Sequence, residues 1–215
     1  MSVVLTSHDE FLWHTLRIND WIDAERYVEI PTLSVMFASM PDDLVWAAAP
    51  FRLYSWGAPG DGSYVRNNGF FFATGTFGLA LTAGAMIGRA VGNNARRQRA
   101  VADSMPRWML SASGSVFVSN LGFYLATPRG LYTWTWGPIS SMQLVQPGQV
   151  SITGTSEGGQ VHWLVATDAA ELLFTLWARV RHPSHPQFSS RAWLDAGWFE
   201  RMNQAGRALP PNLSG

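Results

Sequence analysis

The sequence predicts an α+β protein, in which a set of antiparallel β-strands is followed by a C-terminal helix that packs against them. Residues 114–166 consist of short runs rich in Val, Phe, Tyr, Trp and Thr, and these runs are separated by Asn, Gly and Pro. A helical pattern of apolar residues follows at 168–181 and ends before Pro183. A second helical pattern occupies residues 7–30. These observations favour a β-rich unit with helices at both termini.

Composition narrows the functional classes. The chain has 215 residues, no cysteine and a formal net charge of +0. The lack of cysteine excludes disulfides, cysteine-based zinc sites and thiol catalysis, and the balanced charge removes a global attraction to nucleic acid. Charged residues make up 14% of the chain, about half of the share that is usual for a soluble domain. The first residues contain no basic stretch followed by an apolar core, so we expect no secretory signal and a cytoplasmic protein.

Residues 1–31 are predicted to form an N-terminal helical segment. Ser7 stands three residues before Glu10, which is the spacing of a capping box at the start of a helix. Residues 32–75 are predicted to add strands and a Gly/Pro-rich loop to the sheet. The Pro-Asp-Asp sequence at 41–43 divides two short apolar runs, and this pattern indicates strand, turn and strand.

A long helix is predicted at residues 76–105, where the sequence changes from apolar to basic. No charged residue occurs between Arg66 and Arg89. As one helix, residues 70–88 would reach roughly 28 Å, close to the ~30 Å thickness of the bilayer hydrocarbon. Three interpretations stay open: a helix packed inside a soluble protein, attachment to a membrane surface, or a single membrane span. Every fourth position carries a small residue, a stripe that favours close helix packing and consists of Thr76, Ala80, Gly84, Gly88 and Gly92.

Arginines gather after the apolar run and define a candidate basic patch for binding a membrane or a partner. Its members are Arg89, Arg96, Arg97, Arg99 and Arg107. Each arginine close to an anionic lipid surface contributes about 1 kcal/mol to attachment. The expected partner is therefore an anionic lipid surface, at the inner face of the plasma membrane, or another protein.

Residues 108–183 are predicted to form the β-rich domain together with its capping helix. Alternation along one strand places Tyr132, Trp134 and Trp136 on the same face, which we expect to be buried. The remaining residues, 188–215, are predicted to contain a short helix and a tail.

The helix at 168–181 carries signals at both of its ends. Thr167 or Asp168 can cap its N-terminus through a side-chain oxygen. Arg179 and Arg181 stand in the last turn, where the helix dipole favours cations.

A series of short strands carries the motifs that relate this chain to a known family. These strands lie at 116–120, 123–125, 139–142 and 150–152, and a helix follows the last strand of the series. Over about residues 114–183, the pattern resembles bacterial PH-like and GRAM-like domains. The resemblance implies an antiparallel β-barrel or sandwich closed by a C-terminal helix, with the long helix as an insertion.

One departure from the family pattern limits what the resemblance implies. Leu121 and Gly122 occupy a place that is often basic in these domains. No element between two strands carries the clustered lysines and arginines of phosphoinositide-binding members. The resemblance therefore implies the barrel and not a lipid specificity.

The sequence contains no recognisable catalytic constellation. It has no Gly-x-Ser-x-Gly elbow, and the spacing of His8 and His14 does not place two metal ligands on one helical face. We therefore expect a non-catalytic PH-like binding module without cofactor or metal, and no binding of nucleic acid. A homodimer formed through the long helix is left open. The alternatives are a small enzyme with an unrecognised pocket and a single-span membrane protein with a cytoplasmic PH-like domain.

Overall fold

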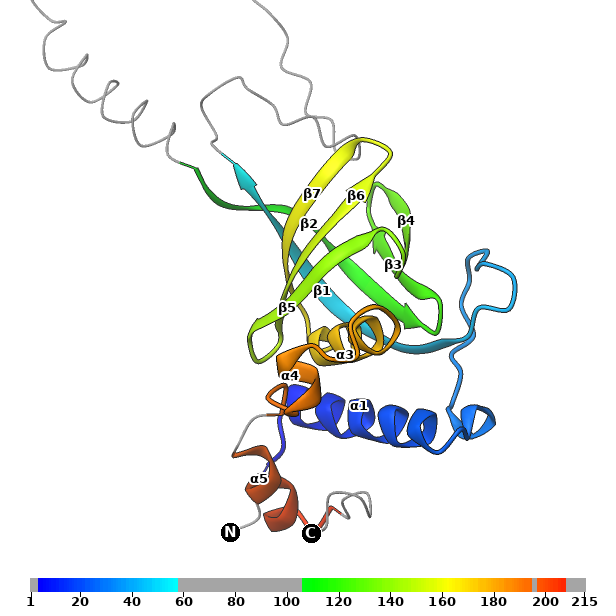
Figure 1. Ribbon diagram of the computed structural model, residues 1–215, viewed down its shortest axis with the longest axis vertical. Coiled ribbons are helices and arrows are strands. Elements are labelled where there is room, and N and C mark those ends of the chain that lie inside the picture. The colour runs from blue at the N-terminus through cyan, green and yellow to red at the C-terminus, as the bar shows by residue number, and fades with distance from the viewer. Residues whose placement is uncertain (1–3, 58–105, 195–196, 208–215) are drawn as a thin grey trace, which may run out of the picture.

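The described chain is a curved β-sheet with helices grouped at one of its ends (Figure 1). The structure is a computed structural model, and it describes residues 4–57, 106–194 and 197–207. The α+β class predicted from the sequence is confirmed. In chain order, the described elements are α1 (Ser7–Asp23), η1 (Tyr27–Glu29), β1 (Val45–Gly57), β2 (Arg107–Ser119), β3 (Gly122–Thr127), β4 (Gly130–Thr135), β5 (Ile139–Gln146), β6 (Gln149–Ser156), β7 (Gly159–Ala166), α3 (Ala170–Arg181), α4 (Pro186–Ser189) and α5 (Trp198–Gln204).

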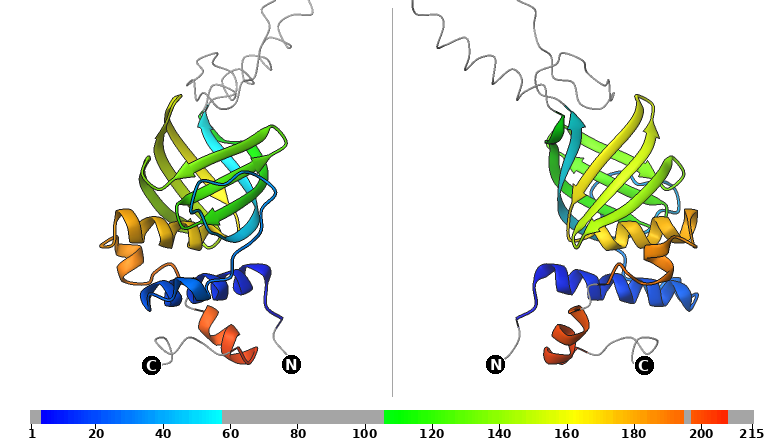
Figure 2. Two further views of the ribbon diagram at one scale, coloured as in Figure 1. Left: turned by 90° about the vertical axis from the view of Figure 1, so that its right-hand side faces the viewer. Right: turned by 60° about the vertical axis from the view of Figure 1, so that its left-hand side comes forward.

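All of these strands belong to one seven-stranded antiparallel sheet with the order β4-β3-β2-β1-β7-β6-β5. The first and last strands pair through a short register that runs from Arg52 opposite Ala166 to Ser55 opposite Trp163. Strand β1 therefore joins a β1–β4 meander to a β5–β7 meander. Because sheets twist, the strands wrap around a common interior, as the two views of Figure 2 show.

The sheet curls without closing, so the predicted antiparallel β-barrel or sandwich is corrected to one open, strongly curved sheet. Strands β4 and β5 are its two edges, and no ladder joins them in the described part of the chain. Backbone groups of the turn between β4 and β5 form hydrogen bonds within the turn and with β6. The N–H of Ile139 donates to the Trp136 carbonyl (3.3 Å), and the Pro138 carbonyl accepts from Thr155 on β6 (3.0 Å).

The concave face of the sheet forms the main core. The prediction for the aromatic strand is confirmed, because Trp134 and Trp136 are 8% and 4% exposed and Tyr132 is half-buried. Trp134 on edge strand β4 meets Trp163 on β7 edge to face, with 4.9 Å between ring centroids. This contact spans the interior and fills the space between the two meanders with aromatic rings.

Helix α1 begins with a capping box that lies one residue before the predicted one. The hydroxyl of Thr6 accepts from the Asp9 N–H (3.1 Å), and the Thr6 N–H donates to the Asp9 carboxylate (3.0 Å). The predicted box of Ser7 and Glu10 is therefore wrong. Both frames have the required spacing, and tertiary contacts decide between them because Asp9 is also bound by Arg201.

Helix α1 ends at Asp23, earlier than the predicted segment, because the chain turns there in a Schellman motif. The N–H of Arg26 donates to the Trp21 carbonyl (2.8 Å), and the N–H of Glu25 donates to the Ile22 carbonyl (3.0 Å). Glu25 takes the left-handed conformation at φ 57°, where glycine is more usual. The sequence lacks the glycine that would have signalled this end.

Residues 31–44 connect η1 to β1 without forming the first of the two predicted strands. The predicted turn at 41–43 is present, and only the second apolar run becomes a strand. The connection is held instead by aromatic contacts: the ring centroids of Phe37 lie 5.1 Å from Phe117 and 4.9 Å from Tyr124. The Tyr124 hydroxyl also accepts from the Met40 N–H (3.0 Å) and donates to Asp43.

The C-terminal helices pack at one end of the sheet, with α3 against β5, β6 and α1. Helix α3 begins at Ala170 with no side-chain cap, so the predicted capping by Thr167 or Asp168 is wrong. The Thr167 hydroxyl accepts from the Ala169 N–H (3.3 Å) in the turn before the helix. Among the described residues of the predicted 188–215 segment, the end of α4 and all of α5 are helical, and Trp198 of α5 is fully buried.

The segment that joins β1 to β2, residues 58–105, lies outside the described residues. The end of the predicted 32–75 segment and the predicted long helix at 76–105 fall within it. No helix in the described ranges is long and apolar enough to cross a membrane.

Candidate functional site

The last residues of β1 and the first residues of β2 form an exposed apolar surface, here called the aromatic patch, which consists of Tyr54, Trp56, Trp108 and Leu110. Tyr54 pairs with Leu110 and Trp56 pairs with Trp108. Their neighbour Leu53 is fully buried, and alternate residues of a strand point to opposite faces. The patch therefore lies on the outer face of the sheet.

The aromatic patch is well exposed and its rings contact one another. Trp56 is 53% exposed and Leu110 is 59% exposed, whereas Tyr54 and Trp108 are half-buried. The ring centroids of Trp56 and Trp108 lie 5.4 Å apart in an edge-to-face arrangement. Trp108 makes a second edge-to-face contact with His162 of β7 at 5.1 Å. The patch thus presents large apolar side chains that are held in place by their neighbours.

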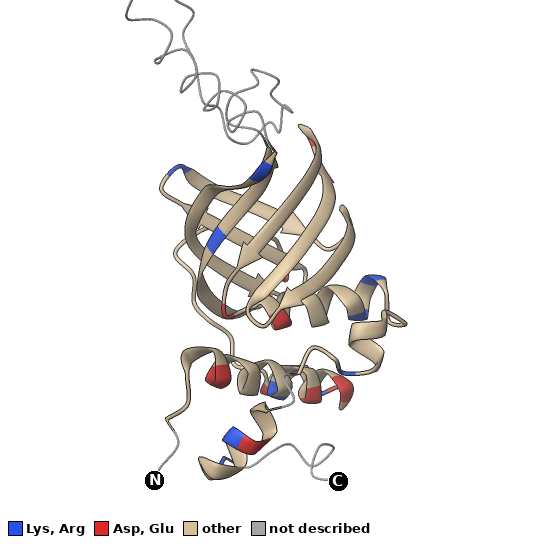
Figure 3. Ribbon diagram, turned by 90° about the vertical axis from the view of Figure 1, so that its left-hand side faces the viewer, with Lys and Arg blue, Asp and Glu red and all other residues tan. Residues whose placement is uncertain are grey.

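The sheet beneath the patch carries little charge. Arg52 and Arg107 are the only Arg, Lys, Asp or Glu residues within the seven strands, and Figure 3 shows how the other charges gather on helices and turns. Arg107 is exposed and pairs with Gly57 at the end of the ribbon, directly next to the Trp56–Trp108 pair. No strand therefore offers a carboxylate that would repel an anionic surface.

Only Arg107 of the predicted basic patch lies among the described residues. Arg89, Arg96, Arg97 and Arg99 fall in the 58–105 segment, as does the predicted small-residue stripe of Thr76, Ala80, Gly84, Gly88 and Gly92. This segment follows the end of β1 at Gly57 and precedes the start of β2 at Arg107. The aromatic patch therefore lies next to both points at which the segment joins the sheet. Sequence reasoning missed the patch, because it placed only Tyr132, Trp134 and Trp136 on a face and assigned no face to Trp56 and Trp108.

A cavity of about 720 Å³ lies near the opposite, helical end of the sheet. It forms where the pairing of β1 with β7 ends, because Arg52 pairs with Ala166, the last residue of β7, and β1 has no β7 partner before Arg52. The N-terminal turn of α1 and the β5–β6 turn border the gap. Its polar lining includes His8, Arg52, Ser113, Gln149, Thr167 and Asp168.

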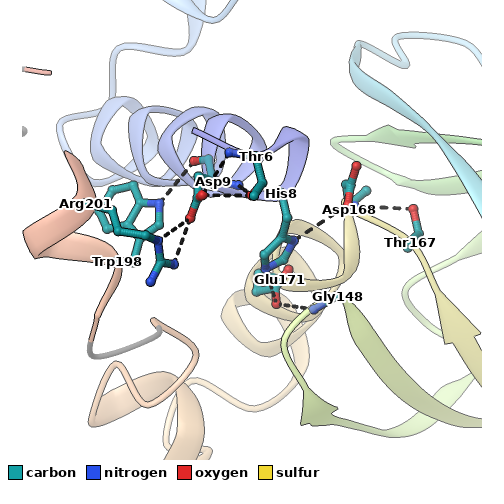
Figure 4. A network of polar contacts seen from close by, with 10 residues as sticks. Thr6, His8, Asp9, Gly148, Thr167, Asp168, Glu171, Trp198 and Arg201 are labelled. Atoms are coloured by element: carbon teal, nitrogen blue, oxygen red, sulfur yellow. Dashed lines mark hydrogen bonds and ion pairs between the residues drawn. The ribbon is translucent and has the colours of Figure 1, made fainter. Parts of the chain in front are cut away.

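His8 joins two acidic side chains beside this cavity (Figure 4). Its Nδ1 lies 3.8 Å from Asp168 Oδ1, and its Nε2 lies 3.5 Å from Glu171 Oε1. The same Glu171 oxygen accepts from the Gly148 N–H at 2.8 Å. The cluster therefore links the first turn of α1, the first turn of α3 and the β5–β6 turn.

Glu171 is the most strongly perturbed acid of the cluster. The residue is 1% exposed, and this burial raises its pKa to about 7, although the hydrogen bond from Gly148 opposes the shift. Nearby Asp168 adds to the rise in pKa. Glu171 therefore gains or loses its proton near neutral pH. In the sequence it appeared only as an acidic residue of a helix start, because nothing local signals its burial.

A second polar contact holds the other side of the same helical turn. Arg201 of α5 donates two hydrogen bonds to Asp9 Oδ1, at 3.0 and 2.8 Å, and Trp198 Nε1 donates to the Asp9 carbonyl at 3.1 Å. Burial tends to raise the pKa of Asp9, but the hydrogen bonds from Arg201 and Thr6 outweigh it and leave the pKa below its usual value. Helix α5 is therefore anchored to the start of α1.

Neither region has the donor set of a metal centre. Among the described residues, no group of three or more His, Cys, Asp or Glu side chains could hold a metal ion. His8, Asp168 and Glu171 instead form an acid–imidazole cluster that is suited to binding and releasing protons.

The chain matches no known protein family, no curated protein and no solved structure. The function is therefore inferred from the chemistry of the two regions themselves.

Proposed function

We propose that the protein is a non-catalytic binding module with a PH-like fold that attaches to an anionic membrane surface, on the cytoplasmic side, through the β1–β2 end of its sheet. The observation that carries the proposal is the aromatic patch, with Trp56 and Leu110 more than half exposed beside Arg107. Tryptophan side chains favour the membrane–water interface because their rings are apolar and their N–H is polar.

The connection between β1 and β2 adds a second contribution to attachment. It contains the charge-free run between Arg66 and Arg89, followed by the arginines of the basic patch. The aromatic patch lies at the ends of β1 and β2 that lead into this connection. The patch and the connection therefore bind the same membrane surface in this proposal. At about 1 kcal/mol for each arginine, several arginines together with the exposed Trp56 suffice for reversible attachment.

The PH-like assignment has support from the order of the elements. Two antiparallel meanders joined through β1 and β7 are followed directly by a helix that packs on β5 and β6. The resemblance implies antiparallel strands followed by a C-terminal helix, and this order of elements supports the proposal. The finer features of that family remain part of the proposal.

Co-sedimentation with vesicles tests the electrostatic part. Wild-type protein is expected to sediment with phosphatidylcholine vesicles that contain phosphatidylserine, and less so as salt rises, because salt screens the arginines. Replacing Arg96, Arg97 and Arg99 by Ala should remove most of this salt-dependent binding. In the matched control, Arg181 and Arg191, which are exposed at the helical end, are replaced by Ala. This variant should bind the vesicles as wild type does.

The aromatic part is tested at high salt, where the remaining binding is apolar. Trp56→Ala should weaken partitioning fivefold to thirtyfold, on the order of 1–2 kcal/mol of lost burial. Val145→Ala, at an exposed position of β5, is the apolar control and should change little. If wild-type protein ignores anionic vesicles at low salt, the membrane proposal is wrong, and a protein partner becomes the candidate for this exposed apolar surface.

A further inference from the structure

We propose that His8, Asp168 and Glu171 form a proton-sensitive latch, which holds the first turn of α1, and with it α5, against the helical end of the sheet. The latch is independent of membrane attachment, since it lies at the end of the sheet away from the aromatic patch.

The position of the first turn of α1 makes a latch effective. On one side His8 reaches Asp168 and Glu171, and on the other side Asp9 is bound by Arg201 (Figure 4). Asp9 and His8 are adjacent in the chain, so one turn of helix connects α3 to α5. A movement of this turn away from α3 therefore also strains the contacts of α5.

Glu171 is the group whose ionisation changes the strength of the latch. Its Oε1 is satisfied by the Gly148 N–H, but its Oε2 is buried and has no hydrogen-bond partner among the described residues. An ionised buried carboxylate with an unsatisfied oxygen is costly, and the protonated form avoids most of that cost. The closed latch therefore favours a protonated Glu171.

The surrounding charges act in the same direction. His8 faces Glu171 from α1, Asp168 faces the cluster from the β7–α3 connection, and the β5–β6 turn contributes the Gly148 N–H. Arg52 of β1 lines the adjoining cavity. The Asp168 carboxylate raises the pKa of Glu171 further, because two ionised carboxylates close together repel each other. Ionisation of Glu171 therefore weakens the latch.

The direction of the pH effect follows from the raised pKa of Glu171. The folded state holds the proton up to about pH 7, whereas an exposed glutamate releases it near 4.5. The stabilisation is therefore fully present below about pH 4.5 and is lost as pH rises towards 7. Opening of the first turn of α1 should become roughly tenfold to hundredfold more frequent between pH 5 and pH 8.

Amide hydrogen exchange on the full chain measures this opening, after correction for the pH dependence of intrinsic exchange. Wild-type protection at the start of α1 and in α5 should fall by that factor between pH 5 and pH 8, while the central strands β1 and β7 change less. Glu171→Gln, which keeps an acceptor for Gly148, should remove the dependence on pH. The control Glu10→Gln removes an exposed acid that pairs with Arg207 and should keep it.

Two results would overturn the latch. One is an equal pH dependence of α1 protection in wild type and Glu171→Gln. The other is measured on wild-type protein alone and does not depend on a variant that folds. NMR titration of the Glu171 carboxyl carbon is expected to give a midpoint well above the ordinary ~4.3 of a glutamate. An ordinary midpoint would exclude the proposal, whatever the vesicle experiments show.

Discussion

At the scale of single residues, Asp9 is the side chain that does most to connect distant parts of the chain. It caps α1 through Thr6 and binds Arg201 of α5, and it is only 2% exposed. A buried carboxylate is tolerated here because each of its oxygens accepts hydrogen bonds. Its role is therefore both local, as a helix cap, and tertiary, as an anchor for the C-terminal segment.

Asp9→Asn should lower the free energy of unfolding by about 1–3 kcal/mol, because it removes the charge that pairs with Arg201 and weakens the cap. Arg201 is partly exposed, which keeps the expected loss below that of a fully buried pair. Urea denaturation at neutral pH measures the change. Since the pKa of Asp9 lies below 3.8 in the folded protein, its contribution is present above that pH and is lost as pH falls through the lower value.

The control for this prediction is the neighbouring exposed acid. Glu10 pairs with Arg207 in solvent, and Glu10→Gln should cost less than about 1 kcal/mol. A loss from Glu10→Gln as large as that from Asp9→Asn would show that helix charge, and not the buried contact, explains the effect.

At the scale of elements, the start of β3 depends on a glycine. A Cβ added to Gly122 would lie 1.9 Å from the Trp134 carbonyl oxygen and 2.8 Å from the Thr135 Cα on the neighbouring strand. These are backbone atoms, which cannot move aside as a flexible side chain can. In the resemblance to PH-like domains, this residue occupied a position that is often basic, and the close approach of β4 gives a physical reason for a glycine.

Gly122→Ala should therefore destabilise the protein by about 1–3 kcal/mol through overpacking against β4. Thermal or urea unfolding, followed by circular dichroism, measures the effect. Gly137→Ala is the matched control, because the nearest atom to its added Cβ is the Thr135 hydroxyl at 4.0 Å. Equal stability of both variants would mean that β3 and β4 can separate at this point without cost.

At the scale of the whole molecule, the two ends of the sheet have different properties. The helices and most acidic residues lie at one end, and the aromatic patch with Arg107 lies at the other (Figures 1 and 3). Helix α5 meets the start of α1 at the helical end through Trp198 and Asp9. The arrangement leaves the β1–β2 end unobstructed by the described helices, which suits it to contact a large surface.

Trp198→Ala should release the C-terminal segment while the sheet stays folded. Trp198 is fully buried and donates to the Asp9 carbonyl, so its removal costs about 3–5 kcal/mol of local packing. Limited trypsin digestion should then cleave at Arg201 and Arg207 much faster than in wild type, with strand circular dichroism retained. Phe199→Ala, at a partly buried position, is the control and should be cleaved more slowly than Trp198→Ala. Unchanged cleavage of Trp198→Ala would show that α5 is held by other contacts.

The sequence by itself determined the features that depend on neighbours in the chain. Alternation and turn residues predicted the strands from residue 114 onward, the burial of Trp134 and Trp136 and the helix that follows β7, because these patterns repeat at the period of the element itself. They also favoured the α+β class. The basic patch and the long helix remain predictions, since nearly all of their residues lie outside the described ranges.

Only the tertiary structure decided which distant segments meet. The choice of Thr6 as the cap depends on Arg201. Strand β1 pairs with β7, and the sheet stays open because no ladder joins β4 to β5 in the described part of the chain. The aromatic patch and the His8–Glu171 contact arise in the same way. Hydrogen bonds and burial between residues far apart in sequence leave no periodic pattern along the chain, so their free energies become visible only when the fold brings those residues together.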